Sequence, residues 1–123
     1  MKYLFLLYAD APMPEPGTPE ARKLLEDWTE AEQAMAAAGV LIDCAPLHPV
    51  AVSTTVRVRN GETLLTDGPA AEIKEQFGGY TLVDCAGLDE ALRWAATVPT
   101  AFSGSVEVRP VVQIPDSAAE VPG

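Results

Sequence analysis

Two strand–helix–strand patterns separated by a hairpin signal constrain the fold of this chain more than any other feature. The first begins with the apolar run Lys2–Tyr8, which is typical of a buried strand. The second places a helical pattern at residues 88–96 between extended segments at 79–85 and 105–112. The order strand, helix, hairpin, strand, helix, strand predicts an α+β fold whose helices lie on one face of a sheet.

The first helix has the clearest local signals. Thr18 is a favoured N-cap, Pro19 suits the first helical position, and Glu20 places negative charge near the positive end of the helix dipole. Apolar residues then recur at helical spacing as far as Ala38, and Gly39 is a typical C-terminal cap. These signals predict one amphipathic helix between Thr18 and Gly39.

A β-hairpin is predicted between the two units. Val56 and Val58 alternate with polar residues, and Asn60-Gly61 is a strong two-residue turn because both residues tolerate positive φ. Residues 62–66 would return antiparallel. We therefore expect a ferredoxin-like split βαβ fold (βαββαβ) with an extra β-hairpin. The sheet face without helices is apolar in this arrangement, and a homodimer joined through the sheets would cover it.

Length and charge limit the domain count and the partners. The 123 residues fit one domain, which we place at residues 1–113, with a disordered tail at 114–123. Hydrophobic residues make up 48% of the chain, which is enough to build a core. The net charge of -10 argues against a nucleic-acid partner and against an anionic membrane surface.

The N-terminal apolar run is too short for a signal peptide, and no run approaches transmembrane length, so a cytoplasmic protein is expected. Cys44 and Cys85 are not in a CxxC arrangement and are expected to be free, buried thiols. The sequence has no credible zinc spacing, phosphate loop, GxGxxG or nucleophile elbow. No cofactor and no metal are therefore expected.

Polar chemistry is concentrated after the hairpin, where Asp67-Gly68-Pro69 breaks the returning strand. Two interpretations of Asp67 are open: its carboxylate fixes the turn by accepting backbone N–H groups, or it is a general base that contacts a substrate. If the turn is only a folding device, Asp67→Ala would lower stability by about 1 kcal/mol or more and change nothing else.

The segment Ala70–Phe77 is predicted to form one or two helical turns. Its charged residues Glu72, Lys74 and Glu75 have two interpretations. They form a solvated face, or Lys74 pairs with Asp67 or Glu72 at a pocket rim, where each group tunes the other's pKa.

Other candidate site residues lie on the predicted strands and loops. His48 lies in a proline-flanked loop and is a candidate because histidine is the side chain best suited to proton transfer near neutral pH, although a lone histidine there is more often only a loop residue. Tyr8, Arg57, Tyr80 and Arg109 lie on expected strands. An arginine that reaches a cavity in an acidic protein would select an anionic or enolic small molecule, whereas one on the solvent face would have no such role.

Several separated motifs make the sequence similar to the DGPF-domain proteins of the YCII-like family. The resemblance runs from Met1 to about Val112. The strongest pieces are Met1-Lys2-Tyr3, Leu6-Leu7-Tyr8, Ala37-Ala38-Gly39-Val40-Leu41, Thr54-Thr55-Val56-Arg57, Thr66-Asp67-Gly68-Pro69, Gly78-Gly79-Tyr80, Leu88-Asp89-Glu90-Ala91 and Gly104–Pro110. The resemblance implies a dimeric α/β barrel with a pocket between sheet and helices or near the dimer seam. Because some relatives are encoded beside extracytoplasmic-function sigma factors, it also implies a regulatory context and a possible sigma-factor partner.

The chain departs from the family pattern at two places. Ala70 stands where the family's DGPF motif has phenylalanine, so a ring beside the turn is lost, and Phe77 is a candidate to fill its place. The first helix has no histidine, so the His/Asp pair proposed for the wider group does not carry over.

Two functions remain open. One is a cofactor-independent pocket for proton transfer or elimination, with Asp67 as base, Lys74 as electrostatic partner, and Tyr80 and His48 as donors. The other is a non-catalytic ligand-binding or regulatory module. In both, the candidate ligand-binding residues are Tyr8, Arg57, Gly68, Pro69, Glu72, Tyr80 and Arg109.

Overall fold

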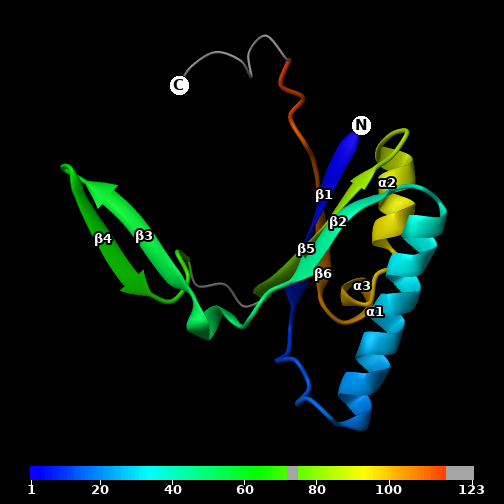
Figure 1. Ribbon diagram of the computed structural model, residues 1–123, viewed down its shortest axis with the longest axis horizontal. Helices are drawn as coiled ribbons and strands as arrows, with labels where there is room; N and C mark the ends of the chain where they lie inside the picture. The colour runs from blue at the N-terminus through cyan, green and yellow to red at the C-terminus, as the bar shows by residue number, and fades with distance from the viewer. Residues whose placement is uncertain (72–74, 116–123) are drawn as a thin grey trace.

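The computed structural model describes residues 1–71 and 75–115. Figure 1 shows the elements in the predicted order, with two short additions, η1 and α3. In chain order they are β1 (Lys2–Ala9), α1 (Pro19–Ala37), β2 (Leu41–Pro46), η1 (Val50–Val52), β3 (Thr54–Arg59), β4 (Glu62–Asp67), β5 (Gln76–Asp84), α2 (Leu88–Ala95), α3 (Thr100–Ser103) and β6 (Ser105–Pro110).

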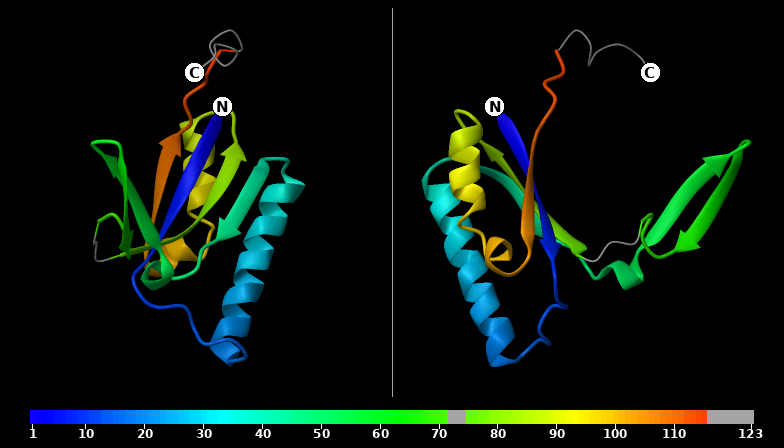
Figure 2. Two further views of the ribbon diagram at one scale, coloured as in Figure 1. Left: turned by 60° about the vertical axis from the view of Figure 1, so that its left-hand side comes forward. Right: turned by 180° about the vertical axis from the view of Figure 1, so that it is seen from behind.

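The main sheet has four antiparallel strands in the order β2-β5-β1-β6. The two strand–helix–strand units interleave in this order, which confirms the predicted ferredoxin-like α+β fold. Helices α1 and α2 lie on the same side of the sheet in both orientations of Figure 2, as expected.

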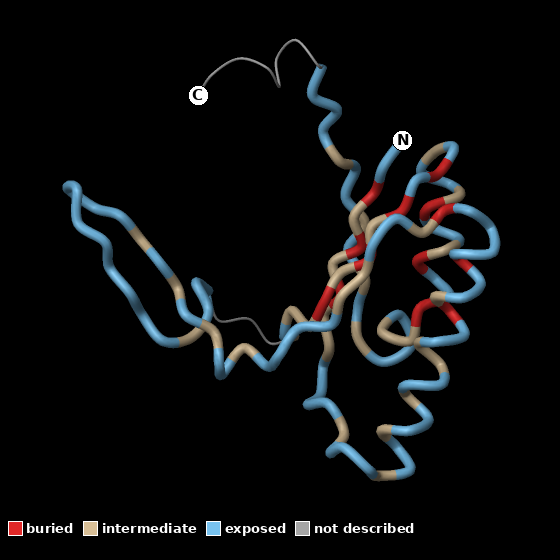
Figure 3. The backbone as a smooth tube through the Cα atoms, in the orientation of Figure 1, coloured by how far each residue is buried: buried red, intermediate tan, exposed pale blue. Residues whose placement is uncertain are grey.

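The core lies between this sheet and the helices, as Figure 3 shows. Tyr3, Phe5 and Leu7 of β1 are 4%, 0% and 6% exposed and point into it. Met35 of α1 and Val83 of β5, both 0% exposed, belong to the same buried cluster. Because side chains alternate along a strand, this arrangement sends the even-numbered residues of β1 to the other face of the sheet.

Helix α1 begins and ends close to the predicted residues. The Thr18 hydroxyl accepts a hydrogen bond from the backbone N–H of Ala21 at 3.2 Å, as an N-cap should. Gly39 has φ +76°, a left-handed conformation that favours glycine and ends the helix.

The helical turns predicted over Ala70–Phe77 are wrong for the described part of that segment. Ala70, Ala71 and Glu75 are in bends, and β5 begins at Gln76. Phe77 pairs with Tyr8 of β1, and this strand pairing gives the segment its extended backbone conformation. The spacing of residues along the sequence does not reveal such a pairing. Residues 72–74 lie outside the described residues.

The predicted hairpin is present as a separate two-stranded sheet, β3–β4. Asn60 and Gly61 have φ values of 52° and 76°, which is the conformation that the sequence required for a two-residue turn. Figures 1 and 2 show the hairpin projecting away from the four-stranded sheet, on the side opposite the helices.

We call the face of the four-stranded sheet that points away from the helices the open sheet face. Leu4 pairs with Leu82, and Leu6 pairs with Tyr80, so these side chains share it. Leu4, Leu6 and Leu82 are half-buried there. Among the described residues, no helix covers this face, as the sequence order predicted.

Candidate functional site

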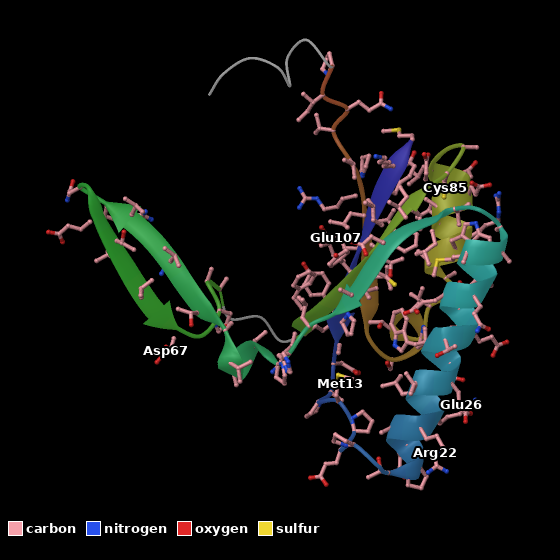
Figure 4. The ribbon with its side chains drawn as sticks, viewed as in Figure 1. Met13, Arg22, Glu26, Asp67, Cys85 and Glu107 are labelled. Atoms are coloured by element: carbon pink, nitrogen blue, oxygen red, sulfur yellow. The ribbon has the colours of Figure 1, made fainter. Side chains whose placement is uncertain are left out.

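The Asp-Gly-Pro turn lies at the base of the β3–β4 hairpin, where Figure 4 labels Asp67. The backbone N–H of Gly68 donates to Ser53 at 2.8 Å, and the Thr55 hydroxyl donates to the Gly68 carbonyl at 2.7 Å. Gly68 has φ +100°, which favours glycine. Asp67 is exposed, and within the described residues no hydrogen bond or ion pair involves its carboxylate. The turn is therefore stabilised by hydrogen bonds of the Gly68 backbone to Ser53 and to the Thr55 hydroxyl. The Asp67 side chain does not contribute to it.

Arg57 lies on β3 beside the same turn. Its guanidinium donates to the Ala70 carbonyl at 3.4 Å, so it holds the chain at the position where the family motif has phenylalanine. Pro69 is exposed in the turn itself. The predicted pairing of Lys74 with Asp67 or Glu72 falls on residues 72–74 and lies outside the described residues.

The open sheet face brings together three other candidate residues. Tyr80 lies opposite Leu6, Arg109 lies opposite Leu4, and Tyr8 lies opposite Ser105. Directly opposed residues of antiparallel strands project to the same face, so Tyr8, Tyr80 and Arg109 share it. The structure therefore divides the candidates between this face and the hairpin.

Tyr80 is bound by a carboxylate that the sequence analysis did not select. Its phenol donates to the Asp43 carboxylate at 2.8 Å, from β5 to the edge strand β2. This hydrogen bond is the main cause that raises the pKa of Tyr80 above its ordinary value of 10.0. The pair therefore holds a neutral phenol, oriented by an anion, at the edge of the open sheet face.

We expect Asp43→Ala to lower the pKa of Tyr80 toward 10.0, because the variant removes the acceptor of its proton. In the folded protein the raised pKa stabilises the neutral phenol. This contribution to stability is complete below pH 10 and is lost as the pH rises through the folded pKa. NMR of tyrosine labelled at the phenol carbon, titrated from pH 8 to 12, measures it. Asp10→Ala, which removes an exposed loop acid, is the control. Identical titrations of Tyr80 in both variants would contradict the assignment.

Arg109 has a weaker partner on its own strand. Its Nε lies 3.7 Å from the Glu107 carboxylate, and the two side chains are 69% and 51% exposed. An exposed ion pair at this distance contributes roughly 0–1 kcal/mol, so Arg109 remains able to bind an anion. Figure 4 labels Glu107 on the side of the sheet that faces away from the helices.

An aromatic pair lies near the end of the same face. The rings of Tyr8 and Phe77 have centroids 5.5 Å apart at an interplanar angle of 49°, a tilted arrangement that aromatic pairs favour. Phe77 thus packs on the sheet and not beside the Asp-Gly-Pro turn. Next to this pair the Ser105 hydroxyl donates to the Glu75 carboxylate.

His48 lies exposed in the loop between β2 and η1. Two surface hollows, one bounded by Met1, Lys2, Asp84 and residues 111–115 and the other by residues 86–90 and Arg93, include none of the candidate residues. On the open sheet face, Tyr8 and Tyr80 are half-buried and Arg109 is exposed, and all three lie outside these two hollows.

Comparison with known proteins identifies the family. The model of the YCII-related domain matches residues 1–115. The chain belongs to the YCII-related domain family. A curated relative, "Uncharacterized protein R00369" of Rhizobium meliloti (strain 1021), is 39% identical over 114 residues, which cover 90% of this chain and 92% of the relative. This finding confirms the resemblance drawn from the separated sequence motifs.

Both cysteines of this YCII-related domain are free, as predicted. Cys85 is buried, and burial is the main cause that raises the pKa of its thiol to about 11. Cys44 is only half-buried, so the prediction that it is buried was wrong. Its position on the edge strand β2 explains this exposure. Among the described residues, no three His, Cys, Asp or Glu side chains are grouped to hold a metal ion.

Within the described part of this YCII-related domain, no helix combines the length and the apolar character that crossing a membrane requires.

Sequence reasoning missed Asp43 as the partner of Tyr80 and the ring of Phe77 as the neighbour of Tyr8. It did consider Glu107 as a partner of Arg109, but across two strands, whereas the pair forms along one strand. Asp43 lies 37 residues from Tyr80, and only the β2–β5 register brings the two together. No local signal in the sequence reports that register.

Proposed function

We propose that this YCII-related domain binds a small anionic or enolic molecule on the open sheet face, as a homodimer joined through that face. The observation that carries the proposal is the placement of Arg109 on β6 and of the Tyr80–Asp43 hydrogen bond, at 2.8 Å, across β5 and β2 on the same sheet face, with the leucines of β1 between them. Arginine supplies charge-assisted hydrogen bonds to an anion, and the Tyr80 phenol, whose one proton is donated to Asp43, can donate to a ligand oxygen only in place of that carboxylate. Apolar surface with a few convergent polar groups is the usual composition of a ligand site.

The proposed homodimer would enclose the polar groups of the open sheet face, which a single chain leaves open to water. Leu4, Leu6 and Leu82 are half-buried on a face that no helix of residues 1–71 and 75–115 covers. A second sheet stacked at about 10 Å would bury them and exclude water from the polar groups between the sheets. A ligand between two such sheets would meet Arg109 and Tyr80 in a medium of lower dielectric, where both bind it more strongly.

A second candidate function is cofactor-independent proton transfer or elimination. The raised pKa of Tyr80 favours it, because a phenol that stays neutral can donate its proton to the oxygen of an enolate once that oxygen replaces the Asp43 carboxylate as acceptor. Asp67 is the proposed base that removes a proton from carbon next to a carbonyl. The electron pair of the broken C–H bond moves to the carbonyl oxygen, and reprotonation at carbon completes the exchange.

Oxalate, a planar dianion that resembles an enolate, is the probe for binding. We expect it to shift amide NMR signals of β1, β5 and β6, and we expect Arg109→Gln to weaken its binding about 10–100-fold, because one charge-assisted hydrogen bond is lost. Arg22→Gln, an equal change on exposed α1, is the matched control and should bind as the wild type does. If both variants weakened oxalate binding equally, the loss would follow only from the changed net charge of the protein. That result would contradict a binding site at Arg109.

Pyruvate in D₂O is the probe for proton transfer. We expect the wild type to accelerate deuterium uptake at the methyl group, measured by ¹H NMR, and Asp67→Asn to abolish this acceleration. If oxalate binds at Arg109 and pyruvate does not exchange, the domain is a binding module. If Asp67→Asn exchanges at the wild-type rate, Asp67 is not the base.

A further inference from the structure

The polar residues of the proposed ligand site lie far apart within one sheet. Arg109 is on the edge strand β6, whereas the Tyr80–Asp43 hydrogen bond joins β5 to the other edge strand, β2. Neighbouring strands are about 4.8 Å apart, so β6 lies about 10 Å from β5 and about 14 Å from β2. One small anion does not span that width.

The side chains of these residues also point away from each other. The Tyr80 phenol donates to Asp43 at 2.8 Å, which turns it toward β2 and away from β6. The Arg109 Nε lies 3.7 Å from Glu107, so the arginine side chain follows its own strand. Within one chain, therefore, the guanidinium and the phenol do not converge on a common ligand.

One row of side chains crosses the open sheet face from edge to edge. In strand order its members are Arg109, Leu4, Leu82 and Asp43, each opposite the next. Among the described residues no ion pair involves Asp43, and its hydrogen bonds come from neutral groups. Arg109 and Asp43 are exposed in the single chain, and a stacked second sheet would take both charges out of water. Each charge then needs an opposite charge across the interface.

The direction of the twofold axis decides whether two stacked sheets meet this need. An axis along the strands reverses the row, so that Arg109 faces Asp43 of the partner subunit and Leu4 faces the partner's Leu82. An axis across the strands instead lays β2 on β2 and β6 on β6. It gathers both Asp43 carboxylates at one edge of the interface and both Arg109 side chains at the other, where like charges repel. Charge complementarity therefore selects the axis along the strands.

We infer that each ligand site of the homodimer is composite: one subunit supplies Tyr80 and Asp43, and the other supplies Arg109. The Asp43 carboxylate then occupies the position of the ligand, because it accepts the Tyr80 proton and pairs with the partner's Arg109. An anionic ligand binds by displacing this carboxylate from both groups. The inference rests on the proposed function for the ligand and for the sheet-to-sheet dimer, and it adds the pairing of the subunits and an internal competitor.

Dissociation constants of the dimer test the contact between subunits. Arg109→Gln and Asp43→Asn each remove one charge, and we expect each to raise the constant roughly tenfold, because a symmetric dimer loses two ion pairs. Since both residues belong to one pair, the double variant should lie within about threefold of either single variant, whereas independent residues would give about 100-fold. Analytical ultracentrifugation over a concentration series measures all three variants. The matched control adds Arg22→Gln, on exposed α1, to Asp43→Asn and should leave the tenfold effect unchanged.

Oxalate binding separates the roles of the two residues. At protein concentrations well above the dissociation constants, we expect Asp43→Asn to strengthen oxalate binding about tenfold, because the competing carboxylate is lost. The same variant weakens the dimer, whereas Arg109→Gln weakens both the dimer and oxalate binding. A residue that only stabilises the interface would move both measurements in one direction, so weaker oxalate binding by Asp43→Asn would overturn the role of Asp43 as competitor.

Mixed dimers test which subunit supplies Arg109. Chains with Tyr80→Phe and chains with Arg109→Gln are combined one to one and left to exchange subunits. In a composite site, half of the dimers are mixed and each has one intact site, so about a quarter of all sites regain the wild-type affinity for oxalate. If each site lies within one chain, no site regains that affinity and the inference is overturned.

Two further results bear on the inference. Near-ultraviolet circular dichroism of Trp28 and Trp94, which lie on the helices, reports whether the variants fold. A wild type that remains monomeric, or folded variants whose effects on the dissociation constant multiply, would overturn the pairing of Arg109 with the partner's Asp43. A dimeric wild type that does not bind oxalate would overturn the proposed function, while the dissociation constants still decide the pairing.

Discussion

Replacing Phe5 with alanine is expected to lower the free energy of unfolding by about 3–5 kcal/mol. Phe5 is 0% exposed at the centre of β1, between Thr81 of β5 and Val108 of β6. The variant removes a whole ring from the layer between sheet and helices and leaves a cavity that a strand paired on both sides cannot collapse to fill. Since small domains are stable by about 5–15 kcal/mol, this loss removes a large share of the total.

Urea unfolding followed by tryptophan fluorescence measures the effect of Phe5→Ala. The control is Leu25→Ala on α1, which also truncates a large apolar side chain but at a position that is 68% exposed. We expect Leu25→Ala to change stability by no more than about 0.5 kcal/mol, because alanine is at least as good a helix former. Similar losses in the two variants would mean that the core does not lie between β1 and the helices.

Gly104→Ala is expected to lower stability by about 2–3 kcal/mol through steric overlap. A Cβ at this position would overlap the carbonyl oxygen of Tyr8 and would lie 3.2 Å from the Cα of Ala9. Both neighbours are backbone atoms of β1, so relief requires β6 to move away from the centre of the sheet. The start of β6 would then lose its register with Tyr8 and the contact of Ser105 with Glu75.

Gly78→Ala is the matched control for Gly104→Ala. A Cβ at Gly78 would have its nearest neighbours at 3.9 Å and 4.0 Å, which is ordinary contact. We expect a change of less than about 1 kcal/mol, since alanine also reduces the conformational entropy of the unfolded chain. Thermal unfolding of the two variants measures the difference, and a Gly104→Ala protein as stable as Gly78→Ala would contradict the close approach of β6 to β1.

The fold was predictable because its strongest determinants are local. Thr18 and Gly39 bound α1 through cap geometry, and Asn60-Gly61 sets the hairpin through its backbone conformation. The apolar run Lys2–Tyr8 predicted a central strand, and the structure shows that its odd-numbered residues are the ones in the core. The error over residues 70–77 has the opposite cause: Phe77 follows a pairing with Tyr8 that lies far away in the sequence.

The candidate site was predictable only as a set of residue types. Asp67, Tyr80 and Arg109 were selected from their positions next to turns and on strands, whereas their arrangement depends on two separate sheets. The Asp-Gly-Pro turn has the local chemistry of a site, but the hairpin that carries it projects away from the sheet. The separation between the Asp-Gly-Pro turn and the four-stranded sheet depends on the path of the chain between them, which short motifs do not encode.

By itself the sequence determined the types and order of the main helices and strands, the capped ends of α1, the turn of the hairpin and the family, because each depends on neighbouring residues or on a pattern spread along the chain. Only the tertiary structure decided that Asp43 binds Tyr80, that Phe77 packs on Tyr8, and that the β3–β4 hairpin lies apart from the core. These features depend on strand register and on the direction in which the chain leaves the sheet, and both are set by packing between residues distant in sequence.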